Sequence, residues 1–109
     1  MRKIEEQMID AIRDKQTLCK DNTSVTYNYQ TNSSGVYLRG NHIATVGNNY
    51  VEIFDGGWRT NTTKSRLNAI INSLCDGRMF GVFQKNYQWF IKDDVVNVEF
   101  KNGYTLPRD

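Results

Sequence analysis

The chain is 109 residues long, with 39% hydrophobic and 24% charged residues, one proline and a net charge of +2. This composition is typical of a compact domain and excludes a disordered chain, which would have fewer apolar residues and a larger charge imbalance. No apolar run approaches the roughly 20 residues of a membrane-spanning helix, and the first residues lack the apolar stretch of a secretory signal. We therefore expect a single domain over residues 1–109 with no membrane attachment.

Residues 3–20 predict an amphipathic helix. Apolar residues recur at helical spacing, and charged residues occupy the other face. The apolar positions are Ile4, Met8, Ala11, Ile12, Leu18 and Cys19. The polar cluster at residues 21–24 is expected to end this helix.

Residues 25–54 predict an antiparallel meander of three or four strands. Val25, Tyr27 and Tyr29 alternate with polar residues, which is the period of a half-buried strand. Further strands are predicted over residues 36–39, 41–46 and 50–54. The chain has twelve asparagines, in keeping with many turns between short strands.

A second helix is predicted to begin near Thr62 or Thr63, either of which can serve as the N-cap. Its buried stripe consists of Leu67, Ile70, Ile71 and Leu74. The pair Asp76-Gly77 ends it. Strands are then predicted over residues 79–83, 87–91 and 95–100, with a last short strand over 104–106 after an Asn-Gly turn.

The predicted architecture is α+β, in the order helix, meander, helix, meander. Two helices would pack on an antiparallel sheet of about six or seven short strands, because strands with one apolar face need a cover. The strand order cannot be read from the sequence. An open sheet of this size has an edge strand, so homodimerisation by strand pairing is a further expectation.

The two cysteines, Cys19 and Cys75, each lie near the end of an apolar helical stripe. Buried free thiols are therefore expected rather than a disulfide. One histidine and two distant cysteines give none of the spacings of a metal site, so neither a metal nor another cofactor is expected.

The most informative stretch runs from residue 56 to residue 68, with the sequence GGWRTNTTKSRLN. From residue 56 to residue 92, six basic residues accompany one acid, a local charge of +5. Lys64 and Arg66 fall in the first turn of the predicted second helix, where free N–H groups and the helix dipole are already positive. We interpret the stretch as a phosphate or carboxylate pocket. Its predicted members are the cations Arg59, Lys64 and Arg66, the hydroxyls of Thr62, Thr63 and Ser65, and Trp58 as a stacking face.

The same stretch also has a purely structural interpretation. Lys64 and Arg66 would then lie over the sheet and pair with acids such as Asp55 or Glu52, while Trp58 would anchor the loop in the core. The phosphate-loop pattern G-x-x-x-x-G-K-[ST] is not present. The sequence leaves both interpretations open.

A second candidate surface is the aromatic set of the last meander. Aromatic residues interleaved with lysines on antiparallel strands are typical of platforms that bind single strands. The set comprises Phe80, Phe83, Tyr87, Trp89, Phe90 and Phe100, flanked by Lys85, Lys92 and Lys101. Strand alternation would place Tyr87 and Trp89 on one face and Phe90 on the other, so at least half of these residues are expected to fill the core.

Catalysis has little support in the sequence. His42 is the one side chain suited to act as a general base near neutral pH, and no spacing brings a serine, cysteine or carboxylate to it. Asp93 and Asp94 are interpreted as a turn. We therefore expect no enzyme activity.

Two strings in the central third of the chain form a pattern: GNHIAT at residues 40–45 and GWRTNTTKSRLNA at residues 57–69. They resemble the G-x-x-I-A and G-W-x-T-x-T-T-x-S-R-L-N-A stretches of small, largely uncharacterised proteins encoded by bacteriophages and prophages. The resemblance implies a phage protein that acts in the cytoplasm of the bacterial host. By their place in the pattern alone, it also implies site residues at Thr60, Thr62, Thr63, Ser65, Arg66 and Asn68.

Two functional hypotheses follow from the sequence. The first is a non-enzymatic nucleic-acid-binding protein that acts through the basic helix start, with Arg59, Lys64 and Arg66. The alternative is a protein-binding inhibitor or modulator of a host bacterial factor in defence or transcription, which would use an exposed aromatic face. Salt distinguishes them, because the affinity of a protein that neutralises phosphates falls steeply as salt rises.

Overall fold

The computed structural model describes all 109 residues and contains two helices and nine strands. Their order is α1 (Lys3–Arg13), β1 (Leu18–Lys20), β2 (Thr23–Asn28), β3 (Ser33–Leu38), β4 (Asn41–Val46), β5 (Tyr50–Ile53), α2 (Asn61–Leu74), β6 (Phe80–Lys85), β7 (Gln88–Asp93), β8 (Val96–Glu99) and β9 (Tyr104–Pro107). The predicted α+β class and the order helix, strands, helix, strands are confirmed. The strands form two sheets, and β1 lies where the end of the first helix was predicted.

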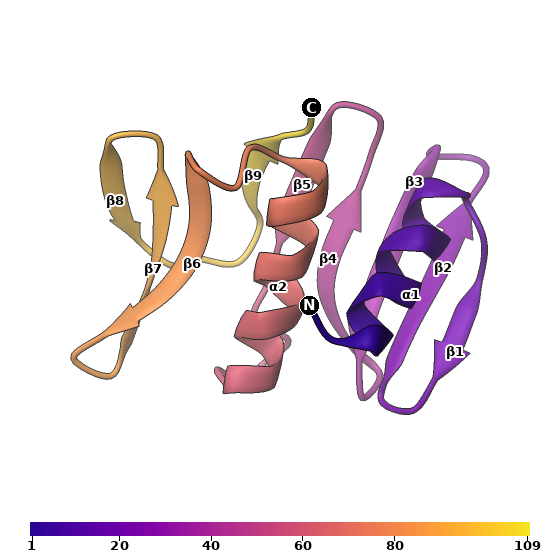
Figure 1. Ribbon diagram of the computed structural model, residues 1–109, viewed down its shortest axis with the longest axis horizontal. Coiled ribbons are helices and arrows are strands. Elements are labelled where there is room, and N and C mark those ends of the chain that lie inside the picture. The colour runs from indigo at the N-terminus through magenta and orange to yellow at the C-terminus, as the bar shows by residue number, and fades with distance from the viewer.

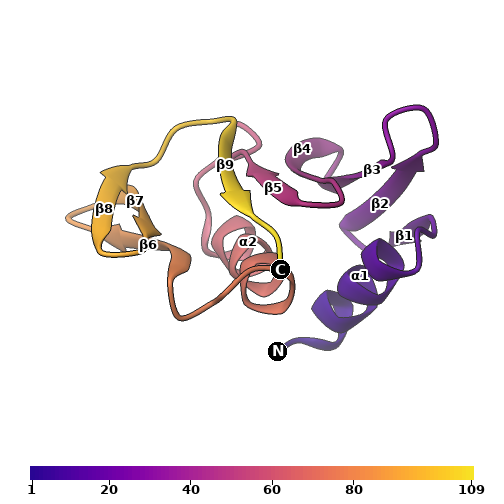
Figure 2. The same cartoon turned by 90° about the horizontal axis from the view of Figure 1, so that it is seen from above.

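Both sheets are antiparallel. The larger has the order β1-β2-β3-β4-β5-β9, and the smaller has the order β6-β7-β8. In Figure 1, α1 and α2 lie in front of the larger sheet, and the smaller sheet lies on the far side of α2 from α1. Figure 2 shows from above that both helices are on the same side of the larger sheet. Because α2 contacts β4, β5 and β6, it joins the two sheets.

The core consists of 24 buried apolar residues that form one cluster. Alternate residues of the larger sheet, such as Val25 and Val36, point toward the helices and are fully buried. Met8 of α1 and Ile70 of α2 are fully buried in the same cluster from the helix side. The pattern of apolar residues in both helices therefore matches the faces that the structure buries.

The first helix is shorter than predicted and ends at Arg13 rather than residue 20. Lys15 has a φ of 54° and donates its N–H to Ile12 O, while the N–H of Gln16 reaches Ala11 O. These two bonds satisfy carbonyls at the end of the helix in a Schellman motif, with lysine at the left-handed position that glycine usually takes. Leu18 and the two residues after it are thereby free to pair with β2 as β1.

The second helix begins earlier than predicted, because Thr60 and not Thr62 or Thr63 is the N-cap. The hydroxyl of Thr60 accepts a hydrogen bond from the N–H of Thr63 at 3.1 Å. Lys64 and Arg66 are therefore the fourth and sixth residues of α2, beyond its first three N–H groups. The N-cap thus lies two or three residues earlier than predicted, so Lys64 is at the end of the first turn, whereas the predicted place of Arg66 in that turn is wrong because it lies in the second.

The cysteines differ in their surroundings. Cys75 is a buried free thiol as predicted, and burial raises the pKa of its thiol to about 11. The expectation of burial is wrong for Cys19, which is exposed. The reason is that Cys19 belongs to the edge strand β1 rather than to a helical apolar stripe.

Two aromatic residues of the meanders are also more exposed than the alternation predicts. Tyr29 lies beyond the end of β2 and is 84% exposed. Tyr87 is 98% exposed in the turn between β6 and β7, where it and Asn86 have φ values of 65° and 52°. Such left-handed pairs suit two-residue hairpin turns, although the second position usually holds glycine. Trp89 and Ile91 of β7 are buried together, as the alternation predicts.

Asn68 closes one edge of the smaller sheet. Its side-chain Nδ2 donates to Val82 O and its Oδ1 accepts from Val82 N, both at 2.8 Å. The amide thus supplies β6 with the pair of hydrogen bonds that a neighbouring strand would give, and it attaches α2 to the smaller sheet.

The Asn68→Ala variant is expected to lose about 1 to 3 kcal/mol of unfolding free energy, because a peptide N–H and C=O lose their partners. Urea denaturation measures this loss. Asn72→Ala is the matched control, since Asn72 is exposed one turn later on α2. Equal losses in the two variants would contradict a special role for Asn68.

Candidate functional site

A cavity of about 320 Å³ lies at the start of α2. It is formed by the end of β3, the start of β4, the loop between β5 and α2, and the first residues of α2. Its lining residues are Leu38, Arg39, Asn41, Ile43, Asp55, Gly56, Trp58, Thr60 and Thr63. Leu38 and Ile43 are buried, so the cavity combines an apolar wall with a polar rim.

The β3–β4 connection shapes one side of the cavity. Arg39 and Gly40 form a tight turn with φ values of 51° and 78°, which leaves the Arg39 side chain exposed at the rim. On β4, Ile43 is an extra residue, because Ala44 pairs with Val36 and the next register pair is formed by His42. This bulge lets Ile43 and Ala44 both be buried and brings Ile43 into the cavity wall.

The loop between β5 and α2 shapes the other side. Asp55 accepts the N–H of Gly57 at 2.8 Å, and its own N–H donates to the Asn102 side chain at 2.8 Å. Gly56 has a φ of 68°, and a Cβ there would meet Ile43 Cγ2 at 3.0 Å, so a side chain would both strain the backbone and crowd β4.

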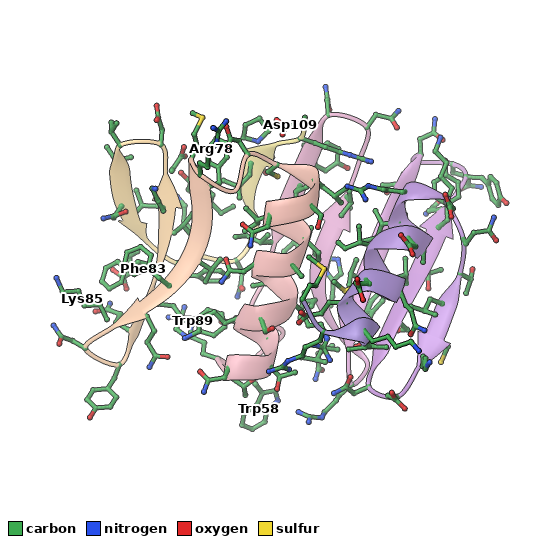
Figure 3. The ribbon with its side chains drawn as sticks, in the orientation of Figure 1. Trp58, Arg78, Phe83, Lys85, Trp89 and Asp109 are labelled. Atoms are coloured by element: carbon green, nitrogen blue, oxygen red, sulfur yellow. The ribbon has the colours of Figure 1, made fainter.

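This loop holds Trp58 at the mouth of the cavity. Trp58 is 70% exposed, so the interpretation that it anchors the loop in the core is wrong. Its backbone is fixed on both sides: its N–H donates to Asp55 O at 3.3 Å, and its carbonyl accepts the Thr63 hydroxyl at 3.3 Å. Figure 3 shows Trp58 at the N-terminal end of α2, with its ring projecting from the molecule.

Arg59 is held between the loop and the smaller sheet. Its Nε lies 3.2 Å from Asp55 Oδ2, and one terminal nitrogen donates to Phe100 O at 3.4 Å. The guanidinium carbon is 5.8 Å from the Trp89 ring centre and 5.3 Å from that of Phe100. Arg59 therefore fixes the loop against the aromatic core of the smaller sheet.

Arg66 lies in the interior and not in the cavity. It is 3% exposed, and its Nη1 is 2.8 Å from Glu5 Oε2 of α1. Its other nitrogens donate to the side chains of Thr23 and Asn22, and Ser65 donates to the same Glu5 oxygen at 2.6 Å. The predicted partners Asp55 and Glu52 are thus not those that Arg66 uses.

The pKa of Glu5 reflects this network. Burial raises the pKa of the Glu5 carboxyl. Hydrogen bonds from the Ser65 and Arg66 side chains and from the N–H of Arg2 lower this pKa, as does the positive charge of Arg66, and together they outweigh the effect of burial. The net result is a pKa below the ordinary value, so Glu5 is ionised at neutral pH.

The other predicted site residues are dispersed. Lys64 extends to the smaller sheet, where its Nζ donates to Gln84 Oε1 at 3.3 Å. Thr62 is half-buried in the first turn of α2, and Asn68 binds β6. Of the nine predicted residues, the cavity brings together Trp58, Thr60 and Thr63.

Comparison with known proteins identifies the family. Residues 1–107 match the family model described as Kyanoviridae Gp96 protein. The chain belongs to this phage-encoded family. Its membership confirms the phage origin that the resemblance implied. No curated protein and no solved structure matches the chain. Neither α1 nor α2 of this Gp96 family protein has the length and hydrophobicity of a membrane-spanning segment.

Sequence reasoning missed three polar residues of the cavity in this Gp96 family protein. Arg39 and Asn41 come from the β3–β4 connection, about 20 residues before α2, and Asp55 comes from the loop that precedes α2. The signal available in the sequence is the break at Gly40 between two predicted strands, whereas the left-handed conformation of Arg39 is seen only in the structure.

His42 lies on the face of the larger sheet that the helices leave uncovered. Its Nε2 is 2.8 Å from Thr45 Oγ1, and its ring packs between Tyr37 and Phe54, at centroid distances of 5.4 and 4.5 Å.

No group of three or more His, Cys, Asp or Glu side chains is arranged to hold a metal ion. The polar and aromatic groups that line the cavity are the indole of Trp58, the hydroxyls of Thr60 and Thr63, and the side chains of Arg39, Asn41 and Asp55.

Proposed function

We propose that this phage protein is a non-enzymatic nucleic-acid-binding protein that stacks a base on Trp58, at the cavity where α2 begins. The observation that carries the proposal is the exposed Trp58 ring at the mouth of a cavity of about 320 Å³. A base is a flat, partly apolar ring with hydrogen-bonding edges, which suits an indole face beside a polar rim.

The exposure of Trp58 supports a ligand at this position. A large apolar side chain left in water forgoes a burial free energy of about 1.5 to 3 kcal/mol. The protein nonetheless fixes the Trp58 backbone through Asp55 and Thr63 while leaving its ring in solvent. A stacked base would cover the ring without any change in the backbone.

The charges around the cavity support an anionic ligand. Arg39 lies on its rim with no carboxylate within ion-pair distance, whereas Asp55 is already paired with Arg59. The first turn of α2 holds no acid, so its N–H groups and dipole remain attractive to phosphate. The proposed site therefore relies on Arg39 and the start of α2, in place of the predicted Lys64 and Arg66.

The test is the salt dependence of binding to labelled DNA and RNA, single- and double-stranded, between about 50 and 200 mM salt. We expect the affinity to fall steeply as salt rises, and the Arg39→Gln variant to lower the slope of log affinity against log salt by about one unit. Arg13→Gln is the matched control, because Arg13 binds Ser73 O near the other end of α2.

Absence of binding to every probe at low salt would refute the proposal. A protein partner would then be the better interpretation, and one observation favours it. Val95 and Val96 are 90% and 53% exposed at the start of β8, the outermost strand of the smaller sheet. An open strand edge with apolar side chains is suited to pairing with a strand of another protein.

A further inference from the structure

We propose that the outward face of the smaller sheet is a second binding surface, specific for single-stranded nucleic acid; this inference rests on the function proposed above. The outward face is defined by the side chains that point away from α2. They are Phe83 and Lys85 of β6, Gln88, Phe90 and Lys92 of β7, and Glu99 of β8.

The register of the strands separates this face from the core. Val82 pairs with Ile91, and both are buried toward α2, whereas the next pair, Phe83 and Phe90, points the other way and is half-buried. Figure 3 shows the same division: Trp89 lies between the sheet and α2, and Phe83 and Lys85 project on the far side. The aromatic set of the last meander is thus divided between a core group and a surface group.

Phe83 and Phe90 form an aromatic pair on the open face. Their ring centres are 5.6 Å apart, and their planes differ by 22°. Because the two residues are directly opposite on neighbouring antiparallel strands, the sheet backbone fixes both rings. Two rings held in this way on a solvent-facing sheet offer a platform on which unpaired bases stack.

The charge of the face is complementary to a phosphate backbone. Lys85 and Lys92 flank the aromatic pair, each two residues beyond a phenylalanine, and neither is within ion-pair distance of a carboxylate. Lys92 Nζ donates to a backbone carbonyl, that of Arg78, at 2.8 Å. The acid of the face, Glu99, accepts the side-chain amide of Gln88 at 2.9 Å.

This arrangement favours single strands over duplexes for a steric reason. In a duplex the bases stack on one another, so their flat faces cannot reach Phe83 and Phe90. In a single strand the bases can separate and stack on aromatic side chains, and the phosphates can follow the flanking lysines. Duplex nucleic acid could use only the lysines.

The experiment compares labelled single strands of about 12 nucleotides with the matching duplex, for the wild type and the double variant Phe83→Leu/Phe90→Leu. Leucine keeps an apolar side chain on the half-buried face but removes the aromatic ring, so we expect the fold to be retained. Urea denaturation measures the stability of the double variant. We expect the wild type to prefer the single strand and the double variant to lose affinity for it by at least about tenfold, with duplex binding unchanged.

A further variant tests the interaction with phosphate. Lys85→Gln is expected to lower the salt slope for single strands by about 0.7, because the protein then neutralises one phosphate fewer. Arg13→Gln again serves as the control. An unchanged salt slope for Lys85→Gln would show that Lys85 does not neutralise a phosphate of the bound strand.

The outcomes separate the two proposals. Wild-type binding that the double variant retains would overturn the platform and leave the Trp58 site intact. Equal binding of duplex and single strand would overturn the platform and would also contradict base stacking on Trp58. No binding by the wild type to any strand would refute both. A wild-type dimer in size-exclusion chromatography that becomes a monomer in Phe83→Leu/Phe90→Leu would instead assign the face to a second copy of the chain.

Discussion

Replacing Glu5 with Gln is expected to lower the free energy of unfolding by about 3 to 5 kcal/mol, because removing one member of a buried ion pair leaves the other charge uncompensated. The charge left behind is that of Arg66, which is 3% exposed. Glu5 also accepts a hydrogen bond from Ser65, so α1 and α2 are joined at this point by one carboxylate. Urea denaturation at neutral pH measures the loss.

Glu6→Gln is the matched control for this prediction. It makes the same chemical change one residue away, at an exposed position of α1, and is expected to change stability by no more than about 0.5 kcal/mol. Equal losses for Glu5→Gln and Glu6→Gln would show that the buried pair does not stabilise the fold. Replacing the pair together, as Glu5→Leu/Arg66→Met, should restore much of the stability, since no unpaired charge then remains.

The pH dependence provides a second readout of the same pair. The pKa of Glu5 is lower in the folded protein than its ordinary value of 4.5. Its ionised form therefore contributes stability above that value, and the contribution is lost as the pH falls through the lower, folded-state pKa. The stability difference between the wild type and Glu5→Gln should narrow as the pH is lowered from 7 toward 3.

The helices and most strands were predictable because their signals are local. Leu67, Ile70, Ile71 and Leu74 mark the buried face of α2 by spacing alone, and Val25 marks β2 by alternation. The end of α1 was not predictable in this way. Lys15 takes a left-handed conformation that is usually indicated in a sequence by glycine. With lysine at this position nothing marks the helix end, and the spacing of Leu18 and Cys19 predicts that the helix continues.

The candidate site was predictable in part, for a related reason. Trp58, Thr60 and Thr63 belong to one segment, so a sequence pattern could group them. The partner of Arg66 could not be found from spacing, because Glu5 lies 61 residues away and meets it through helix packing. Asp55 and Arg39 likewise meet at the cavity only because sheet pairing brings the β3–β4 turn beside the loop before α2.

The Trp58→Ala variant is expected to bind single-stranded nucleic acid at least about tenfold more weakly than the wild type, because a base stacked on an aromatic ring contributes about 1 to 3 kcal/mol. The fold should be unaffected to within about 0.5 kcal/mol, since the ring is 70% exposed and packs against little of the protein. Trp58→Phe should keep part of the affinity, because a smaller aromatic face remains. Fluorescence anisotropy measures the binding of each variant.

Tyr29→Ala is the matched control, an exposed aromatic residue in the turn after β2, and it should bind as the wild type does. The chain has two tryptophans, and the other, Trp89, is 1% exposed. In the wild type, acrylamide should therefore quench mainly the fluorescence of Trp58, and bound nucleic acid should reduce this quenching. In Trp58→Phe the fluorescence comes from Trp89 alone, so neither acrylamide nor nucleic acid should change it. Quenching of Trp58 that continues unchanged in saturating nucleic acid would show that the bases bind elsewhere, since a stacked base necessarily covers the indole face.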